Sequence, residues 1–359
     1  MTKSSAWERV LPLISLLLAL LLAPYAHAAD GAAEQAQRQQ DTQAQRQGTQ
    51  PGNNAPVWRD VRKGENPYQT TQVRGVETNI LVQPGGETWR RIRNGPITLY
   101  GGILLIAVPL LIFGFYRWKG PIRLHAKPTG RLIERFSDWE RIVHWTTAIS
   151  FVILAVSGIV TLFGKYLILP MFGYTLFSWL AILSKNLHNF VGPLFVFCTL
   201  VMFVTYVKDN LWRAADFVWL KKAGGLLSGE HVPSERYNAG SKIWFWFGVT
   251  LLGLVSSASG LVLDFPNLDQ ARSVMQLANI VHAISAVLFI VMALGHIYIG
   301  TIGAEGAYES MRLGLVDEAW AKEHHDIWYE EVKAGKARQH FADAVPADIK
   351  AQVAQATKA

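Results

Sequence analysis

Two histidines in the last apolar run of the chain have the residue type and spacing for metal binding. His282 and His296 lie in residues 273–304, a stretch without Asp, Glu, Lys or Arg. Their separation is nearly four turns of an α-helix, so both imidazoles point from one helix face, about 21 Å apart. Ionisable groups inside apolar spans are costly and usually functional, and neutral imidazole binds metals and haem iron. The run therefore predicts one helix with two ligands at two depths.

The distribution of apolar residues predicts a membrane protein with five crossing helices. Half of the 359 residues are hydrophobic and only 17% are charged. A hydrocarbon core of about 30 Å is crossed by about 20 predominantly apolar residues. Uncharged runs of this kind occur at residues 97–116, 142–163, 186–207, 243–263 and 273–304.

Three segments are predicted at the N-terminus. Lys3 and Arg9 precede a short apolar core and the small-residue pattern Ala26-His27-Ala28, which is typical of a secretory signal peptide over residues 1–28. An uncleaved anchor helix is the alternative. Residues 29–95 form a periplasmic leader, partly disordered because its first part is polar and lacks apolar periodicity. An additional transmembrane helix follows at residues 96–117.

The basic residues predict the orientation. Residues 117–141, 208–242 and the tail after Ala304 hold seven, six and seven Lys or Arg, against two in 164–185 and one in 264–272. The basic connections are therefore cytoplasmic, with the C-terminal tail at 306–359 inside and the leader periplasmic. Three arginines at positions 90, 91 and 93 favour the opposite orientation. A long leader that follows a signal peptide is, however, largely exempt from the rule that basic residues stay in the cytoplasm.

The charge and cysteine content limit the classes of function. The net charge of +7 is explained by topology and by attraction to anionic membrane lipid, so no nucleic-acid partner is predicted. The single cysteine, Cys198, excludes a disulfide framework, a thiolate iron-sulfur cluster and a covalently attached haem, since each needs more thiols.

The orientation sorts four histidines into two layers. His188 and His282 fall near the outer surface, whereas His144 and His296 fall near the inner surface. This pairing suits two haems b, each held by two histidines, which carry electrons because no iron coordination position is open. Chance packing, a haem-free membrane anchor and a transporter are the alternatives. A proton or metal transporter should carry acidic partners, and the spans contain no Asp or Glu.

Small and polar residues mark two further candidate sites. Gly158 lies fourteen residues after His144, at the outer level, and Gly192 lies one turn after His188, so both could give a porphyrin room. Close helix packing is the alternative. Asn238 and Gly240 begin the fourth span beside the inner level and are candidates for binding a quinone. Ordinary helix capping is the alternative for Asn238.

The pair His324-His325 in the tail has the residue type of a metal site. Adjacent residues on a helix diverge by about 100°, so they do not converge easily on one ion. We therefore expect a solvated or docking face at these positions.

Residues 136–332 resemble the cytochrome b subunit, the gamma subunit, of respiratory formate dehydrogenase. The motifs that carry the resemblance are Glu140-Arg141-Ile142-Val143-His144-Trp145, Leu187-His188 with Gly192, Arg236-Tyr237-Asn238-Ala239-Gly240, Val281-His282-Ala283, Gly295-His296-Ile297-Tyr298 and Trp320-Ala321-Lys322-Glu323-His324-His325 with Trp328-Tyr329. The histidine layout alone is shared with cytochrome b subunits of nickel-iron hydrogenases and thiosulfate reductases, which remain alternatives.

The resemblance implies an all-α fold, a four-helix transmembrane dihaem cytochrome b bundle over residues 118–305, to which this chain adds one N-terminal helix. It implies the same ligand pairs, His188 with His282 and His144 with His296, and it matches Asn238 and Gly240 to quinone contacts. It also implies a bacterial inner-membrane complex with an iron-sulfur beta subunit and a molybdenum or tungsten alpha subunit, and allows a higher oligomer. Electrons would pass from the iron-sulfur subunit to a quinone, menaquinone or ubiquinone.

Overall fold

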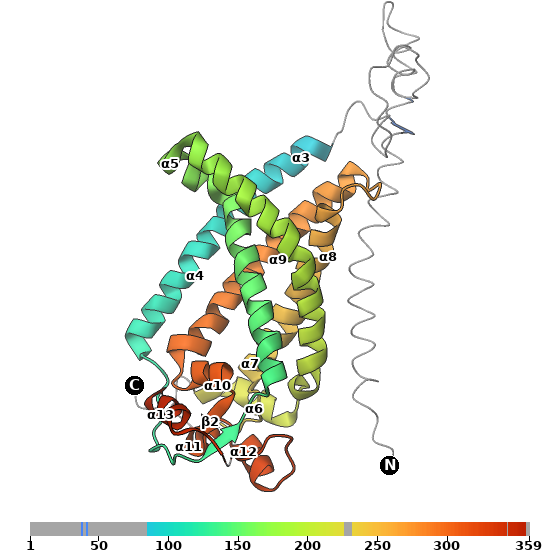
Figure 1. Cartoon of the computed structure of the whole chain (residues 1–359). Helices are drawn as coiled ribbons and strands as arrows, with labels where there is room; N and C mark the ends of the chain where they lie inside the picture. The colour runs from blue at the N-terminus through green and yellow to red at the C-terminus, as the bar shows by residue number, and fades with distance from the viewer. Residues whose placement is uncertain (1–36, 39–40, 42–84, 226–231, 343, 357–359) are drawn as a thin grey trace, which may run out of the picture. The chain divides into compact units, whose positions relative to one another are not determined.

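The computed structural model describes residues 37–38, 41, 85–225, 232–342 and 344–356 (Figure 1). The predicted signal peptide and nearly all of the leader lie outside these residues. The described part of the chain is largely helical, and the strands named within it are β1 (Leu132–Glu134) and β2 (Leu315–Asp317). The predicted all-α class is therefore confirmed.

The helices follow in chain order, with short π-helical or 3₁₀-helical segments labelled η. They are α3 (Gly85–Ile92), η1 (Arg93–Ile97), α4 (Thr98–Lys119), α5 (Asp138–Tyr206), η2 (Val207–Asn210), α6 (Ala214–Lys221), η3 (Ala223–Gly225), α7 (Ala239–Ile243), η4 (Trp244–Leu252), α8 (Gly253–Asp264), α9 (Arg272–Tyr298), η5 (Ile299–Gly303), α10 (Ala307–Leu313), α11 (Glu318–His324), α12 (Asp326–Lys333) and α13 (Ala347–Ala356).

Four continuous helical stretches of the described chain are long and apolar enough to cross a membrane. They are Gly85–Lys119, Asp138–Asn210, Ala239–Asp264 and Arg272–Gly303. The second stretch is 73 residues long and contains two of the five predicted spans. Its backbone breaks at Gly173, where φ is 75°, a value that glycine adopts without a Cβ clash. Figure 1 shows the two arms of α5 running in opposite directions from this break. The chain is thus an integral membrane protein.

The first long helix begins earlier than the apolar run predicts. It starts at Gly85, whereas the prediction placed its start at residue 96. The added turns are polar, and Glu87 pairs there with Arg90 at 2.7 Å and with Arg91 at 2.9 Å. Ion pairs three and four residues apart support a helix on its surface, so the helix extends beyond the part that hydropathy marks.

The fold divides into two compact units, which are described separately. The first contains the chain up to Gly101 together with Val255–Ser285, and the second contains Gly102–Leu254 and Ala286–Ala359. In the first unit, Trp89 Nε1 donates a hydrogen bond of 3.2 Å to Asn279 Oδ1, which ties α3 to α9. A small apolar core joins α8, α9 and the residue before α9 in this unit: Val262, Ala271, Val274 and Ala278.

The second unit contains a small folded part outside the long helices, which we call the C-terminal module: β1, β2, α11 and α12. The strands are antiparallel, with Ile133 opposite Val316. Asp317 is 1% exposed, and its carboxylate accepts hydrogen bonds from the backbone of Thr129, Gly130 and Ala319. The core of the module consists of Ile133, Val316, Trp320, Ala321, Trp328, Tyr329 and Val332. Residues predicted as a tail therefore fold against the segment that precedes α5.

Candidate functional site

His144 on α5 and His296 on α9 face each other within the second unit. Their ring centroids are 6.2 Å apart, with 57° between the ring planes. Imidazole nitrogens bind metal ions at about 2.0–2.1 Å, so two rings that face one ion have centroids roughly 6 Å apart. The Nδ1 atom of His144 is buried and has no hydrogen-bond partner among the described residues. The predicted inner pair thus has the ring spacing of two imidazoles that face one metal centre.

Trp244 orients the His296 imidazole. Its ring stacks on His296 with 4.7 Å between centroids and 10° between planes. Trp244 is the first residue of the π-helix η4, and π-helical turns often occur at functional sites. A Cβ on Gly248 would overlap the Trp244 ring, so this glycine leaves the room that the tryptophan occupies.

His188, on the second arm of α5, is held by the first arm. Its Nδ1 lies 2.9 Å from Ser157 Oγ. The Ser157 hydroxyl donates its own proton to Ile153 O at 2.7 Å, so it accepts from Nδ1. The proton is then on Nδ1 and the lone pair on Nε2, which is how a neighbouring group fixes the tautomer of a metal-binding histidine.

His282, in the first unit, has a closely similar environment. Its Nδ1 lies 3.0 Å from Ser256 O and 3.3 Å from Ser259 Oγ. A carbonyl oxygen only accepts hydrogen bonds, so Nδ1 again carries the proton and Nε2 the lone pair. His188 and His282 are therefore both in the tautomer that has the lone pair on Nε2, the nitrogen that a metal would bind.

A glycine lies against each outer imidazole. A Cβ on Gly158 would be 3.4 Å from His188 Cε1, and a Cβ on Gly260 would be 3.1 Å from His282 Cε1. Gly158 was singled out from the sequence, whereas Gly260 was not. The signal was present, because a Ser-Gly pair occurs in both helices, at 157–158 and at 259–260. Gly192, the other glycine predicted to give clearance, has no described heavy atom within 4 Å of its would-be Cβ beyond its own helix.

Three phenylalanines fill the space between the histidine levels in the second unit. Phe151 and Phe289 have centroids 4.7 Å apart, and Phe195 lies 6.2 Å from Phe151 and 6.1 Å from Phe289. Phe151 and Phe195 lie two turns beyond His144 and His188 on their helix arms. The three rings therefore form an aromatic layer two helical turns from His144 and from His188.

Asn238 is the N-cap of α7. Its Oδ1 accepts hydrogen bonds from Ser241 N at 2.9 Å and from Ser241 Oγ at 3.1 Å, which is the capping role weighed for it from the sequence. Its amide nitrogen donates to no group among the described residues. A Cβ on Gly240 would lie 3.1 Å from the Trp219 ring. Gly240 is therefore small because Trp219 packs against it, and the Asn238 amide keeps two donors for a ligand.

Charged side chains surround the start of α7. Lys242 is fully buried, and its Nζ lies 2.7 Å from Asp216 and 2.8 Å from Glu235. Arg236 pairs with Glu140 at 2.8 Å, and both side chains are 6% exposed. A buried charge is tolerated only when it is paired in this way. Sequence analysis found neither pair, because opposite charges far apart in sequence carry no local pattern.

The hydroxyl of Tyr237 is a further unsatisfied group at the start of α7. It is buried without a hydrogen-bond partner among the described residues. Burial raises the pKa of Tyr237 above its ordinary value, so the phenol keeps its proton. Its ring lies 6.2 Å from Phe136 and 6.2 Å from Tyr206.

The structure corrects the prediction for the histidine pair in the tail. His325 is 4% exposed and does not lie on a solvated face. Its Nδ1 is hydrogen-bonded to Glu235 O, and its Nε2 lies 3.0 Å from Arg135 Nη2. The neighbouring His324 stacks on Trp320, with centroids 4.9 Å apart. The His325 ring also lies against Trp320, with centroids 5.2 Å apart, so the pair belongs to the interior of the C-terminal module.

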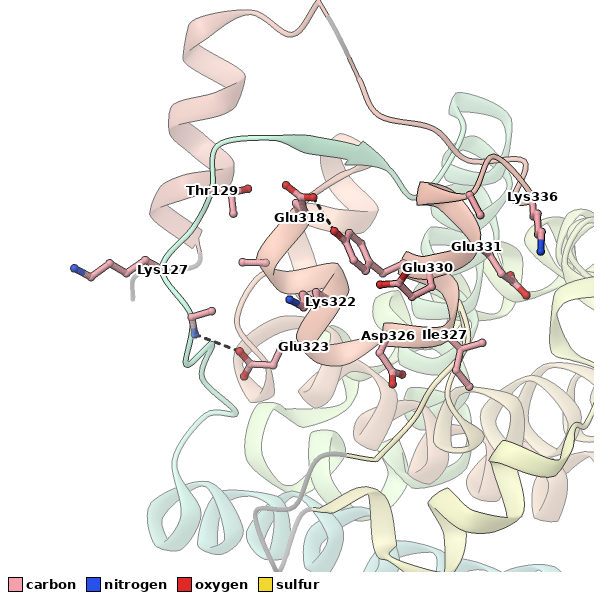
Figure 2. Close-up of a pocket in the computed structure, with 14 residues that line it drawn as sticks. Lys127, Thr129, Glu318, Lys322, Glu323, Asp326, Ile327, Glu330, Glu331 and Lys336 are labelled. Carbon is pink, nitrogen blue, oxygen red and sulfur yellow. Dashed lines mark hydrogen bonds between the residues drawn. The ribbon is translucent and has the colours of Figure 1, made fainter.

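A separate cavity of about 1200 Å³ lies in the C-terminal module. Figure 2 shows its wall, with Glu318 bonded to the Tyr329 hydroxyl at 2.8 Å and Glu323 accepting from a backbone amide of the segment before β1. None of the four candidate histidine ligands lines it. Eight of its fourteen lining residues are charged, and because no histidine lines it, it is not the site that the histidines form.

Comparison with known proteins identifies the class. A family described as prokaryotic cytochrome b561 matches residues 135–314, which is half of the chain and contains all four histidines. The chain belongs to this family. Its cofactor is therefore haem b, and the paired imidazoles and Nδ1 tautomers described above fit that group.

The similar proteins within this class are cytochrome b subunits of formate dehydrogenase. The cytochrome b556(fdo) subunit of Escherichia coli K12 is 35% identical over 210 residues, 56% of this chain and 93% of the relative. The nitrate-inducible cytochrome b556(Fdn) subunit of the same strain is 27% identical over 226 residues, 60% of this chain and 98% of the relative. The cytochrome b556 subunit of Haemophilus influenzae is 26% identical over 210 residues, which cover 55% of this chain and 83% of the relative. The predicted resemblance is confirmed, and the helix Gly85–Lys119 lies before the family match.

Proposed function

We propose that this chain is the dihaem membrane subunit of a formate dehydrogenase. It receives electrons from a periplasmic iron-sulfur subunit, carries them across the inner membrane and delivers them to a quinone near the cytoplasmic side. Formate oxidation belongs to a molybdenum or tungsten alpha subunit, which this chain helps to anchor. The leader is periplasmic and the C-terminal module cytoplasmic, as the basic connections favour.

The observation that carries the proposal is the state of the histidines. His144 and His296 have the separation of two imidazoles on one ion. His188 and His282 each hold a proton on Nδ1 and a lone pair on Nε2. We assign the first pair to the cytoplasmic haem and the second to the periplasmic haem. These environments favour a cytochrome over a haem-free anchor or transporter.

Haem b, held by the four histidines, would supply one-electron transfer. The chain supplies the rest. Ser157 and Ser259 orient the outer imidazoles, Trp244 orients His296, and the phenylalanine layer excludes water between the two levels. At the start of α7, the Asn238 amide donates a hydrogen bond to a quinone carbonyl, with Gly240 on the first turn of the same helix. The reaction of this chain is quinone reduction, with protons taken from the cytoplasm.

The first experiment is a reduced-minus-oxidised absorbance spectrum of the purified protein, with pyridine extraction to count haem per chain. Two non-covalent haems b are expected. A single haem would contradict the dihaem assignment, and a colourless protein would contradict the proposed function as a whole.

Histidine variants test the pairing. His188→Ala and His282→Ala are expected to remove the same outer haem, whereas His144→Ala and His296→Ala remove the inner one. His125→Ala, in the segment before β1, is the matched control and keeps both. Two full haems in any of the four ligand variants would refute that ligand.

A further inference from the structure

The segment that leads into α7 is fixed from outside by the C-terminal module. Backbone groups of three successive residues, Ser234, Glu235 and Arg236, are bonded by side-chain or backbone groups of residues distant in sequence. Ser234 N donates to Asp326 Oδ1 at 2.8 Å, and Ile327 N donates to Ser234 O at 3.2 Å. The next two carbonyls, of Glu235 and Arg236, are bonded by His325 and Arg135.

His325 connects the Glu235 carbonyl to the Arg135 guanidinium. Its Nδ1–H donates to Glu235 O, since a carbonyl only accepts. Its Nε2 therefore carries a lone pair and accepts from Arg135 Nη2 at 3.0 Å. The same Nη2 also donates to Arg236 O at 3.1 Å. A neutral histidine with one defined tautomer is thus needed between a carbonyl and a guanidinium.

The surroundings hold His325 in that form. His325 is 4% exposed and Arg135 is 8% exposed, so neither exchanges its partners readily for water. The Arg135 guanidinium lies 4.7 Å from the Trp320 ring of α11 and 5.0 Å from the Phe136 ring. Burial lowers the pKa of His325 well below its ordinary value, and Arg135 lowers it further.

We propose that His325 is a positioning residue for the quinone site: together with Arg135 it fixes the backbone of residues 234–236, and so the placement of Asn238 and the Tyr237 hydroxyl. The inference rests on the proposed function, because it assigns a role toward the quinone that Asn238 would bind. The C-terminal module would thus affect quinone binding by fixing this backbone segment, and not by contacting the quinone itself.

The test uses purified full-length protein in detergent. The haem is reduced with dithionite, unreacted dithionite is removed, and oxidation of the haem by added menadione is followed by absorbance. His325→Leu removes both hydrogen bonds and leaves Glu235 O buried without its donor. The menadione concentration for half-maximal rate should rise roughly tenfold, with the haem spectrum and the maximal rate kept.

Conservative and neighbouring variants separate positioning from general damage. His325→Gln can donate its amide to Glu235 O and accept from Arg135, so it should restore the wild-type concentration dependence. His324→Gln, whose ring nitrogen bonds the backbone of its own helix at Trp320 O, is the matched control and should have no effect. If His325→Leu loses haem through misfolding, Asp326→Ala replaces it, since it frees Ser234 N while Asp326→Asn preserves that bond.

Failure of this inference and failure of the proposed quinone site give different results. If Asn238→Ala raises the half-maximal menadione concentration but neither His325→Leu nor Asp326→Ala does, the positioning role is refuted. If Asn238→Ala also has no effect, the quinone assignment itself is refuted. An equal loss in His325→Leu and His325→Gln would also overturn the inference, since the hydrogen-bonding atoms would then be irrelevant.

Discussion

Ser157 Oγ lies 2.9 Å from His188 Nδ1 and so joins the two arms of α5. Ser157 is 2% exposed, so this hydrogen bond is sheltered from solvent. Because the serine hydroxyl donates to its own helix, it fixes which imidazole nitrogen keeps the proton. One small side chain thereby sets both the orientation and the chemistry of a ligand.

Removing that hydroxyl should weaken haem binding. Ser157→Ala is expected to lower haem affinity at the outer site about tenfold or more, the usual cost of losing a partner of a metal-binding histidine. Haem loss to apomyoglobin measures it. Ser150→Ala, which removes a bond from Ser150 Oγ to Thr146 O in the same helix arm, is the control and should leave haem loss unchanged. If Ser157→Ala and Ser150→Ala retain haem equally well, the role of Ser157 in haem binding is contradicted.

Bulky residues at the two glycines should displace the outer haem. Gly158→Leu and Gly260→Leu place a branched side chain where even a Cβ would touch the imidazole at 3.4 Å or 3.1 Å. We expect one haem absorbance component to be lost and the inner component to remain. Gly114→Leu, a helical position with open space around its would-be Cβ, should keep both. Two unchanged components in Gly158→Leu would refute the clearance assignment.

The buried ion pair at the start of α5 should contribute strongly to stability. Glu140→Gln removes one of the two carboxylates that pair with the buried Arg236 and leaves Asp209 as the other, so it is expected to destabilise the protein by about 1–3 kcal/mol. The melting temperature of the purified protein in detergent reports this. Asp138→Asn breaks a pair in the same helical turn, but Asp138 is 90% exposed, so its melting temperature should be unchanged. Similar values for both variants would show that Arg236 is stabilised by other groups.

The pKa of His325 predicts a pH dependence of stability. Burial lowers it in the folded state, Arg135 and His324 lower it further, and an unfolded histidine titrates near 6.5. The unfolded chain therefore binds a proton that the folded chain does not. This contribution to stability is complete above about pH 6.5 and is lost as the pH falls toward the folded-state value. The melting temperature should thus fall more steeply on acidification in the wild type than in His325→Gln, and parallel profiles would contradict this.

The pairing of His144 with His296 could be predicted from the sequence because it depends on helix periodicity and on the direction of each span alone. The hydrogen bonds that orient the imidazoles could not be predicted from it. Whether Ser157 reaches His188 depends on how the two arms of α5 are rotated toward each other beyond Gly173. The burial of His325 depends on Arg135, which lies 190 residues away in the sequence. Helix boundaries also differed, since Glu87 and its arginines extend the first long helix beyond its apolar run.

The pairing of β1 with β2 can form only late in synthesis, because the two strands lie far apart in the sequence. β1 ends at Glu134 and β2 begins at Leu315, so every span from α5 to α9 is made between them. The ribosome therefore releases Arg135 long before His325 exists. The segment before α7 therefore lacks its hydrogen bonds to the C-terminal module until translation is nearly finished. A chain that ended after the last span would contain every membrane-crossing helix but could never form these hydrogen bonds.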